Sequence, residues 1–126
     1  SKIFLEGNLI RNEVKWMNKN EFINLCREGK PIPENNREVY RLWEECSFEA
    51  QSIVMKLNTS YHSNTEVIEL FSELTGRKVD PSFVCLPPFY SNFGKNIFIG
   101  RNVFFNIGCS FQDRGGIYIG YRPFYL

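Results

Sequence analysis

Residues 97–120 read IFIGRNVFFNIGCSFQDRGGIYIG, and this stretch decides the fold. It holds four runs of three residues that start at positions 97, 103, 109 and 117, each with apolar first and third residues. Because side chains alternate along a strand, the first and third residues of a run face the same way. Glycine and asparagine lie between the runs and tolerate the backbone angles of tight corners. The pattern therefore predicts very short strands joined by corners.

The spacing between the runs favours a repeat architecture. Three-residue strands are too short for a stable flat sheet, but three of them form the sides of a coil on which the next coil stacks. We expect a hexapeptide-repeat β-helix in which the first residue of each run points inward. Ile117 then lies above Ile97, and the two additional residues within 112–116 loop outward. A small antiparallel meander is the alternative, and the recurrence of Ile-Gly at 99–100 and 119–120 favours the coil.

Three helices are predicted before the strands. The first lies within 17–28, where apolar side chains recur on one face until Gly29 ends the helix. The second follows Asn36, a suitable N-cap, and its apolar residues recur every three or four positions for about six turns. The third follows the capping box of residues 63–66 and ends at Gly76.

These patterns divide the chain into three parts. Residues 1–16 leave two interpretations open, a hairpin turning at Gly7-Asn8 or an extended leader that docks on the main body. Residues 17–78 form a helical cap, and residues 79–126 begin the hexapeptide-repeat β-helix. The predicted fold class is α+β, with a three-helix cap followed by one to two coils.

The composition is that of an ordinary globular protein. The 126 residues are 43% hydrophobic and 23% charged, with a formal net charge of +1, so they give no electrostatic basis for binding nucleic acid or an anionic membrane. There is no signal-peptide core and no membrane-spanning apolar run, and we expect a cytoplasmic protein. The four cysteines lack the spacing of a zinc or redox motif, so we expect reduced cysteines that fill the core.

Seven segments in order resemble a known family. They are EGKP at 28–31, LNTSYH at 57–62, LTG at 74–76, PPFY at 87–90, GKNIFIG at 94–100, NIGC at 106–109 and QDRGGI at 112–117. Together they resemble the maltose/galactoside O-acetyltransferase family of sugar acetyltransferases over about residues 17–120. The resemblance implies a left-handed parallel β-helix, transfer of an acetyl group from acetyl-CoA to a sugar hydroxyl, and homotrimers with active sites between subunits.

The resemblance also implies particular site residues. Asn106, Asp113 and Asn92 match positions that bind the acceptor sugar, and Glu38 is the nearest candidate for an acidic residue from the cap. For each position the alternative is a corner or turn residue that satisfies local backbone groups, and this alternative is the stronger one at Asn92. The single histidine, His62, lies in a loop, where we expect a structural role.

The family's general base is a histidine that would lie beyond residue 126, as would most of the coils that bind acetyl-CoA. We therefore expect a truncated chain that is inactive by itself: a fragment, a frameshift product or a short variant. The competing hypothesis is a non-catalytic module that binds sugar or associates with full-length homologues. We also expect the open end of the coil to be covered by residues 123–126, by the leader or by another chain, because exposed apolar side chains are unfavourable there.

Overall fold

The structure is a computed structural model that describes residues 17–32 and 36–120. Three helices come first: α2 (Lys19–Arg27), α3 (Arg37–Asn58) and α4 (Asn64–Thr75). Six short strands follow: β2 (Val84–Cys85), β3 (Phe89–Ser91), β4 (Ile97–Ile99), β5 (Phe104–Phe105), β6 (Cys109–Phe111) and β7 (Ile117–Ile119). This order confirms the three helices followed by short strands of an α+β chain. The predicted leader or hairpin at 1–16 and the tail at 121–126 lie outside the described residues.

Side-chain caps start the helices where the sequence predicts. Asn36 accepts a hydrogen bond from the Val39 backbone N–H at 3.0 Å, and Ser63 forms its capping box at the start of α4. A second capping box, between Asn18 and Glu21, starts α2. Each cap satisfies a backbone N–H that the helix itself leaves without a partner.

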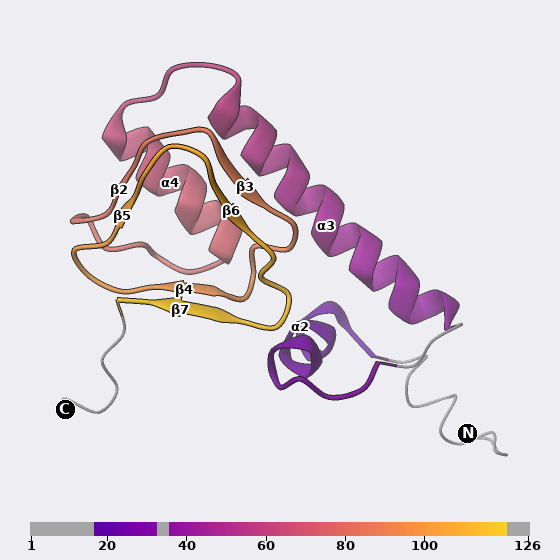
Figure 1. Cartoon of the computed structure of the whole chain (residues 1–126). Helices are drawn as coiled ribbons and strands as arrows, with labels where there is room; N and C mark the ends of the chain where they lie inside the picture. Colours follow the sequence, from indigo (N-terminus) through magenta and orange to yellow (C-terminus); the bar gives the residue numbers. More distant parts are fainter. Residues whose placement is uncertain (1–16, 33–35, 121–126) are drawn as a thin grey trace, which may run out of the picture.

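The strands associate in three parallel pairs: β2 with β5, β3 with β6, and β4 with β7. Figure 1 shows two successive passes of the chain stacked around a triangular outline, the first made by β2–β4 and the second by β5–β7. Ile117 pairs with Ile97, which confirms the predicted stacking. Because the pairs are parallel, the alternative of an antiparallel meander is wrong. Strands β2 and β3 were not predicted, since they lie among prolines that favour a loop.

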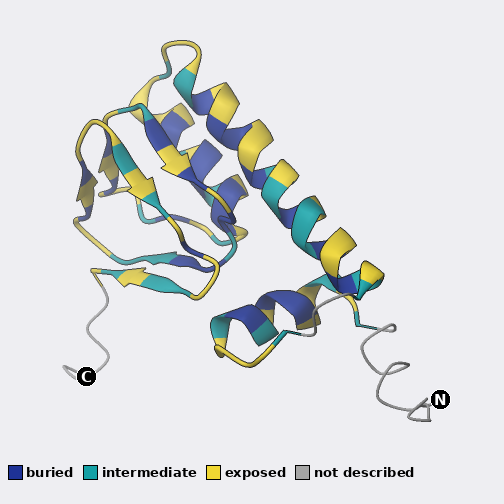
Figure 2. Ribbon diagram, turned by 45° about the vertical axis from the view of Figure 1, so that its right-hand side comes forward, coloured by how far each residue is buried: buried dark blue, intermediate teal, exposed yellow. Residues whose placement is uncertain are grey.

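The helical part and the strands share one apolar core. α4 lies against the triangular passes in Figure 1, and Phe71 of this helix is 1% exposed. The Phe71 ring centroid lies 4.8 Å from those of both Phe83 and Phe89 and 5.9 Å from that of Phe105. Figure 2 shows the buried face of α3 turned toward this core and its other face exposed. The cap and the strands therefore pack as one unit.

A second apolar cluster holds α2 on α3. It contains Phe22, Cys26, Val39, Cys46 and Phe93 from α2, α3 and the corner after β3. The burial of Cys46 raises the pKa of its thiol to about 11, which keeps the thiol protonated and inert. None of the described helices is long and apolar enough to span a membrane.

The inward side chains of the second pass, β5–β7, are less fully buried than those of the first pass, β2–β4. Inward side chains of β6 and β7, among them Phe111 and Ile119, are only partly buried. Their partial exposure agrees with the expectation that apolar side chains at this end of the coil need a cover. What covers this end stays a prediction, because residues 1–16 and 121–126 lie outside the described part of the chain.

Candidate functional site

An open cleft of about 1020 Å³ lies between α2, the first half of α3 and the corner after β6. It is lined by Phe22, Ile32, Asn36, Arg37, Val39, Tyr40, Arg41, Trp43, Glu44 and Arg114. A hollow of about 340 Å³ continues it along the corners after β3 and β6, with Asn92, Phe93, Gln112 and Gly115 in its lining. Trp43 and Arg114 line both spaces, so we treat them as one site, the Trp43 cleft.

An aromatic pair forms one wall of the Trp43 cleft. The rings of Tyr40 and Trp43 stack with their centroids 6.0 Å apart and their planes inclined by 25°. Tyr40 is 61% exposed, and Trp43 is partly buried against the cluster that holds α2. An exposed aromatic platform beside polar groups can pack against the apolar face of a ring-shaped ligand.

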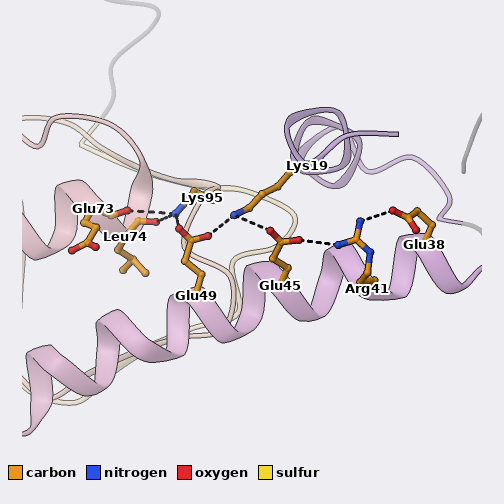
Figure 3. Close-up of polar contacts among 8 residues, drawn as sticks. All are labelled: Lys19, Glu38, Arg41, Glu45, Glu49, Glu73, Leu74 and Lys95. Carbon is orange, nitrogen blue, oxygen red and sulfur yellow. Dashed lines mark hydrogen bonds and ion pairs between the residues drawn. The ribbon is translucent and has the colours of Figure 1, made fainter. Parts of the chain in front are cut away.

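Glutamates along α3 form ion pairs with Arg41, Lys19 and Lys95, as Figure 3 shows. The Arg41 guanidinium donates to the carboxylates of Glu38 and Glu45 on the same helix. The Lys19 ammonium lies 2.6 Å from a Glu49 carboxylate oxygen. This hydrogen bond raises the pKa of Lys19 and lowers that of Glu49, so both groups are charged at neutral pH. Glu38, the predicted acidic residue of the cap, is thus engaged by Arg41.

Asp113 is fully buried beneath the cleft, although the sequence predicted a carboxylate exposed in an outward loop. One carboxylate oxygen accepts from the Ser91 hydroxyl at 2.8 Å, and the other accepts from the Gly94 backbone N–H. Burial raises the pKa of Asp113, while these hydrogen bonds oppose the rise. The upper corner, residues 112–116, stacks on the lower corner, residues 92–96. The expected exposure is wrong because the two corners have the same length, so the upper corner turns Asp113 down onto the lower one. Sugar binding by Asp113 itself stays a prediction.

The two corners are fixed by contacts that the sequence did not reveal. Gly94 has a φ of +88°, and a Cβ atom there would lie 2.8 Å from the Leu74 carbonyl oxygen. Only glycine fits this left-handed position against the end of α4. Asn96 is fully buried and donates to the carbonyl oxygens of Ile23 and Arg114 at 3.2 and 2.8 Å. Asn96 thereby ties α2 to the upper corner and fixes one wall of the cleft.

The structure brings together two of the three predicted acceptor-binding residues. The Asn92 side-chain oxygen accepts from the Asp113 backbone N–H at 3.2 Å, and Asn92 lines the Trp43 cleft. Asn106 lies at a different corner, between β5 and β6, where its side chain accepts from the Ile107 backbone N–H at 2.8 Å. A role for Asn106 in the same site would need a second subunit.

His62 lies outside the Trp43 cleft, in the loop between α3 and α4. Its Nε2 atom is 2.8 Å from the Lys56 carbonyl oxygen and 3.3 Å from the Ser60 hydroxyl, and its Nδ1 atom is 3.7 Å from a Glu66 carboxylate oxygen. A serine on Nε2 and a carboxylate near Nδ1 are the contacts of the histidine in a catalytic triad. However, a carbonyl oxygen accepts hydrogen bonds only, so Nε2 carries a proton and cannot act as a base toward Ser60. This geometry supports a structural role for His62.

The sequence missed the aromatic and cationic wall of the cleft. The spacing of apolar residues along α3 predicts Trp43 as part of a buried stripe, and nothing in the spacing distinguishes a partly exposed tryptophan from a core one. Across the described ranges, no group of three or more His, Cys, Asp or Glu side chains could hold a metal ion.

Comparison with known proteins gives no relative from which a function follows: no family model matches the chain, and no curated protein matches it. The geometry and chemistry of the Trp43 cleft are therefore the basis for the function proposed below.

Proposed function

We propose that β2–β7 are the first two turns of a left-handed parallel β-helix of the hexapeptide-repeat kind. The observation that carries this proposal is the constant spacing of the pairs, because every paired residue meets the one 20 positions later, as Val84 meets Phe104. Three hexads account for roughly 18 of these residues, and the corners before β4 and β7 supply the rest. A Cβ atom on Gly100 would lie 2.3 Å from the Gly120 carbonyl oxygen, so the Ile-Gly steps stack backbone on backbone.

The proposed function is that of a sugar O-acetyltransferase family member whose Trp43 cleft binds the acceptor sugar. The fold proposal and the family resemblance of residues 17–120 both favour this function. The cleft has the residues that sugar recognition needs, an aromatic platform for the ring face and amide groups for the hydroxyls. In this assignment the sugar ring packs on Trp43, and its hydroxyls bind the amides of Asn92 and Gln112.

Asp113 has a positioning role in this proposal. Its backbone N–H holds the Asn92 side chain at 3.2 Å, and its buried carboxylate fixes the lower corner through Ser91 and Gly94. Both corners therefore present their amides to the cleft in a fixed geometry. Preorganised groups of this kind lower the entropic cost of binding a flexible polar ligand.

The described residues do not supply the whole reaction. Acetyl transfer needs a base for the attacking hydroxyl, and the sole histidine of these 126 residues, His62, lies in a different loop with Nε2 bound to a carbonyl oxygen. A second pocket, beside β2, has no arginine or lysine among its described lining residues, so it does not fit the phosphates of acetyl-CoA. No step through acetyl-CoA is assigned to this chain.

The second candidate is a non-catalytic sugar-binding or oligomerisation module. The position and hydrogen bonding of His62 favour it, because the cleft then binds a sugar without a histidine among its described lining residues. A homotrimer or an association with a longer homologue would fit both candidates and would bring Asn106 of one subunit toward the cleft of the next.

Calorimetric titration of the 126-residue chain with maltose and glucose tests the acceptor site. We expect a dissociation constant of about 1 mM for at least one sugar and its loss in Trp43→Ala. Phe48→Ala is the matched control, because Phe48 lies on the same helix but is 68% exposed outside the cleft. Circular dichroism of both variants verifies that they fold. Binding of neither sugar, or binding that survives in folded Trp43→Ala, would refute the acceptor site.

An assay of thiol release from acetyl-CoA in the presence of maltose tests whether this chain alone supplies the reaction. The chain alone is expected to bind sugar without turnover, since the histidine does not face the cleft. Turnover that disappears in His62→Gln would contradict this expectation and make His62 the base.

A further inference from the structure

We infer that the Trp43 cleft selects a sugar that carries an anionic group, a carboxylate or a phosphate, held between Arg37 and Arg114. This inference rests on the proposed function, in which the cleft takes the acceptor sugar. It adds the chemical class of that sugar and the two residues that recognise it.

Arg37 is placed where a cation is unfavourable for the helix itself. It is the first residue of α3, directly after the N-cap Asn36, and the N-terminus of a helix carries a partial positive charge. Within residues 17–32 and 36–120, no carboxylate lies within 4 Å of its guanidinium. A cation at a helix N-terminus that has no acidic partner to offset its cost is a candidate for a functional residue. At this position, the helix end and Arg37 attract an anion together.

Arg114 faces the cleft from the other side, on the corner after β6. Its backbone is fixed, because its carbonyl oxygen accepts from buried Asn96 at 2.8 Å. The neighbouring acid Asp113 is buried and directs its carboxylate to Ser91 and Gly94, and it forms no ion pair with Arg114. In the described part of the chain the Arg114 guanidinium thus has no acidic partner within 4 Å.

Other cations nearby are already paired, as Figure 3 shows. Arg41 lies between two glutamates of α3, and Lys19 and Lys95 share Glu49. Arg37 and Arg114 are the lining cations that remain. The described lining residues include three arginines and a single carboxylate, that of Glu44, so cations outnumber acids in the lining itself.

The arrangement fits a ligand with three chemical features. A ring packs on the Tyr40–Trp43 platform, hydroxyls reach Glu44 and the corner amides, and an anionic substituent lies between the two guanidinium groups. Guanidinium groups bind carboxylate and phosphate through paired, charge-assisted hydrogen bonds. Sugar acids and sugar phosphates combine all three features, whereas neutral sugars leave both arginines without a partner.

Calorimetric titration of the chain with glucose, glucuronate, glucose 6-phosphate and inorganic phosphate tests the inference. We expect at least one of the two anionic sugars to bind about tenfold more tightly than glucose, and the tighter of the two identifies the anion. Arg37→Gln and Arg114→Gln should each remove most of this preference, so that the affinity for the anionic sugar falls toward that for glucose measured on the same variant. Arg101→Gln is the matched control, an exposed corner arginine that does not line the cleft. The preference should weaken as sodium chloride rises from about 50 to about 300 mM.

The possible outcomes separate this inference from the proposed function. Equal affinities for glucose and both anionic sugars would overturn the inference and leave the acceptor site intact. Inorganic phosphate binding as tightly as glucose 6-phosphate would overturn the sugar site, since the ring would then contribute nothing. Coenzyme A that competes with glucose 6-phosphate and weakens in Arg114→Gln would overturn the inference by assigning the arginines to the acetyl donor. No binding of any sugar would refute both.

Discussion

Asp113 shows how a single side chain can hold two stacked corners together. Its carboxylate is a buried acceptor shared by a hydroxyl from β3 and a backbone N–H two residues after Asn92. The net contribution of these hydrogen bonds to stability is modest. Removing the carboxylate costs more, because it leaves buried donors without partners.

Asp113→Ala should therefore lower the free energy of unfolding by about 1–3 kcal/mol, the usual cost of unpaired buried donors. Ser91→Ala should cost less, because the carboxylate stays bonded to Gly94 and the hydroxyl's other hydrogen bond, accepted from the Phe93 backbone N–H at 3.4 Å, is long. Urea unfolding followed by circular dichroism measures both. An Asp113→Ala variant as stable as the original chain would show that the carboxylate does not hold the corners.

At the scale of elements, the contact between α2 and α3 combines an apolar cluster with an ion-pair row. Lys19 of α2 and Lys95, which lies before β4, both reach Glu49 of α3, with N–O distances of 2.6 and 3.7 Å. Glu49 is partly exposed, so solvent screens these pairs and the apolar cluster supplies most of the stabilisation.

Glu49→Gln should lower the free energy of unfolding at pH 7 by up to about 1 kcal/mol. The Lys19 hydrogen bond lowers the pKa of Glu49 in the folded chain. A lowered folded pKa means that the stabilisation is present above the unfolded pKa, usually 4.5, and is lost as the pH falls through the folded value. The difference between the two proteins should therefore close at low pH.

Urea unfolding at pH 7 and at about pH 3 measures this difference. Glu69→Gln, an exposed substitution on α4, is the control and should change stability little at either pH. A difference for Glu49→Gln that stays constant with pH would mean that the ion pairs do not stabilise the contact.

At the scale of the whole molecule, aromatic packing makes the helical cap and the strands one structure. Phe71 of α4 contacts the rings of Phe83, Phe89 and Phe105, which belong to both passes of the chain. Phe71→Ala should reduce the free energy of unfolding by about 3–5 kcal/mol, the usual cost of a large cavity in a core. Helical circular dichroism, which reports the cap, and the amide NMR signals of β2–β7 should report one common transition.

Phe48→Ala is the control for this substitution, because Phe48 is 68% exposed and should change stability little. Two separate transitions in the original chain, or a Phe71→Ala variant that loses only its helical signal, would show that the cap and the strands fold independently.

The sequence by itself determined the local features of this protein. Asn36 and Ser63 start their helices because a cap acts on backbone groups two or three residues away. The runs at 97, 103, 109 and 117 became strands because their alternation and corner residues are equally local, and their spacing predicted the stacking of Ile117 on Ile97.

The tertiary structure alone decided β2, β3 and the candidate site. The first two strands exist because β5 and β6 pair with them 20 residues later, and no local pattern among their prolines reports this pairing. Likewise, the burial of Asp113, the exposure of the Tyr40–Trp43 platform and the presence of Arg37 and Arg114 in one cleft depend on how a helix and two corners pack. The residues of the cleft belong to no repeat of the sequence, so only the packed chain assembles the cleft.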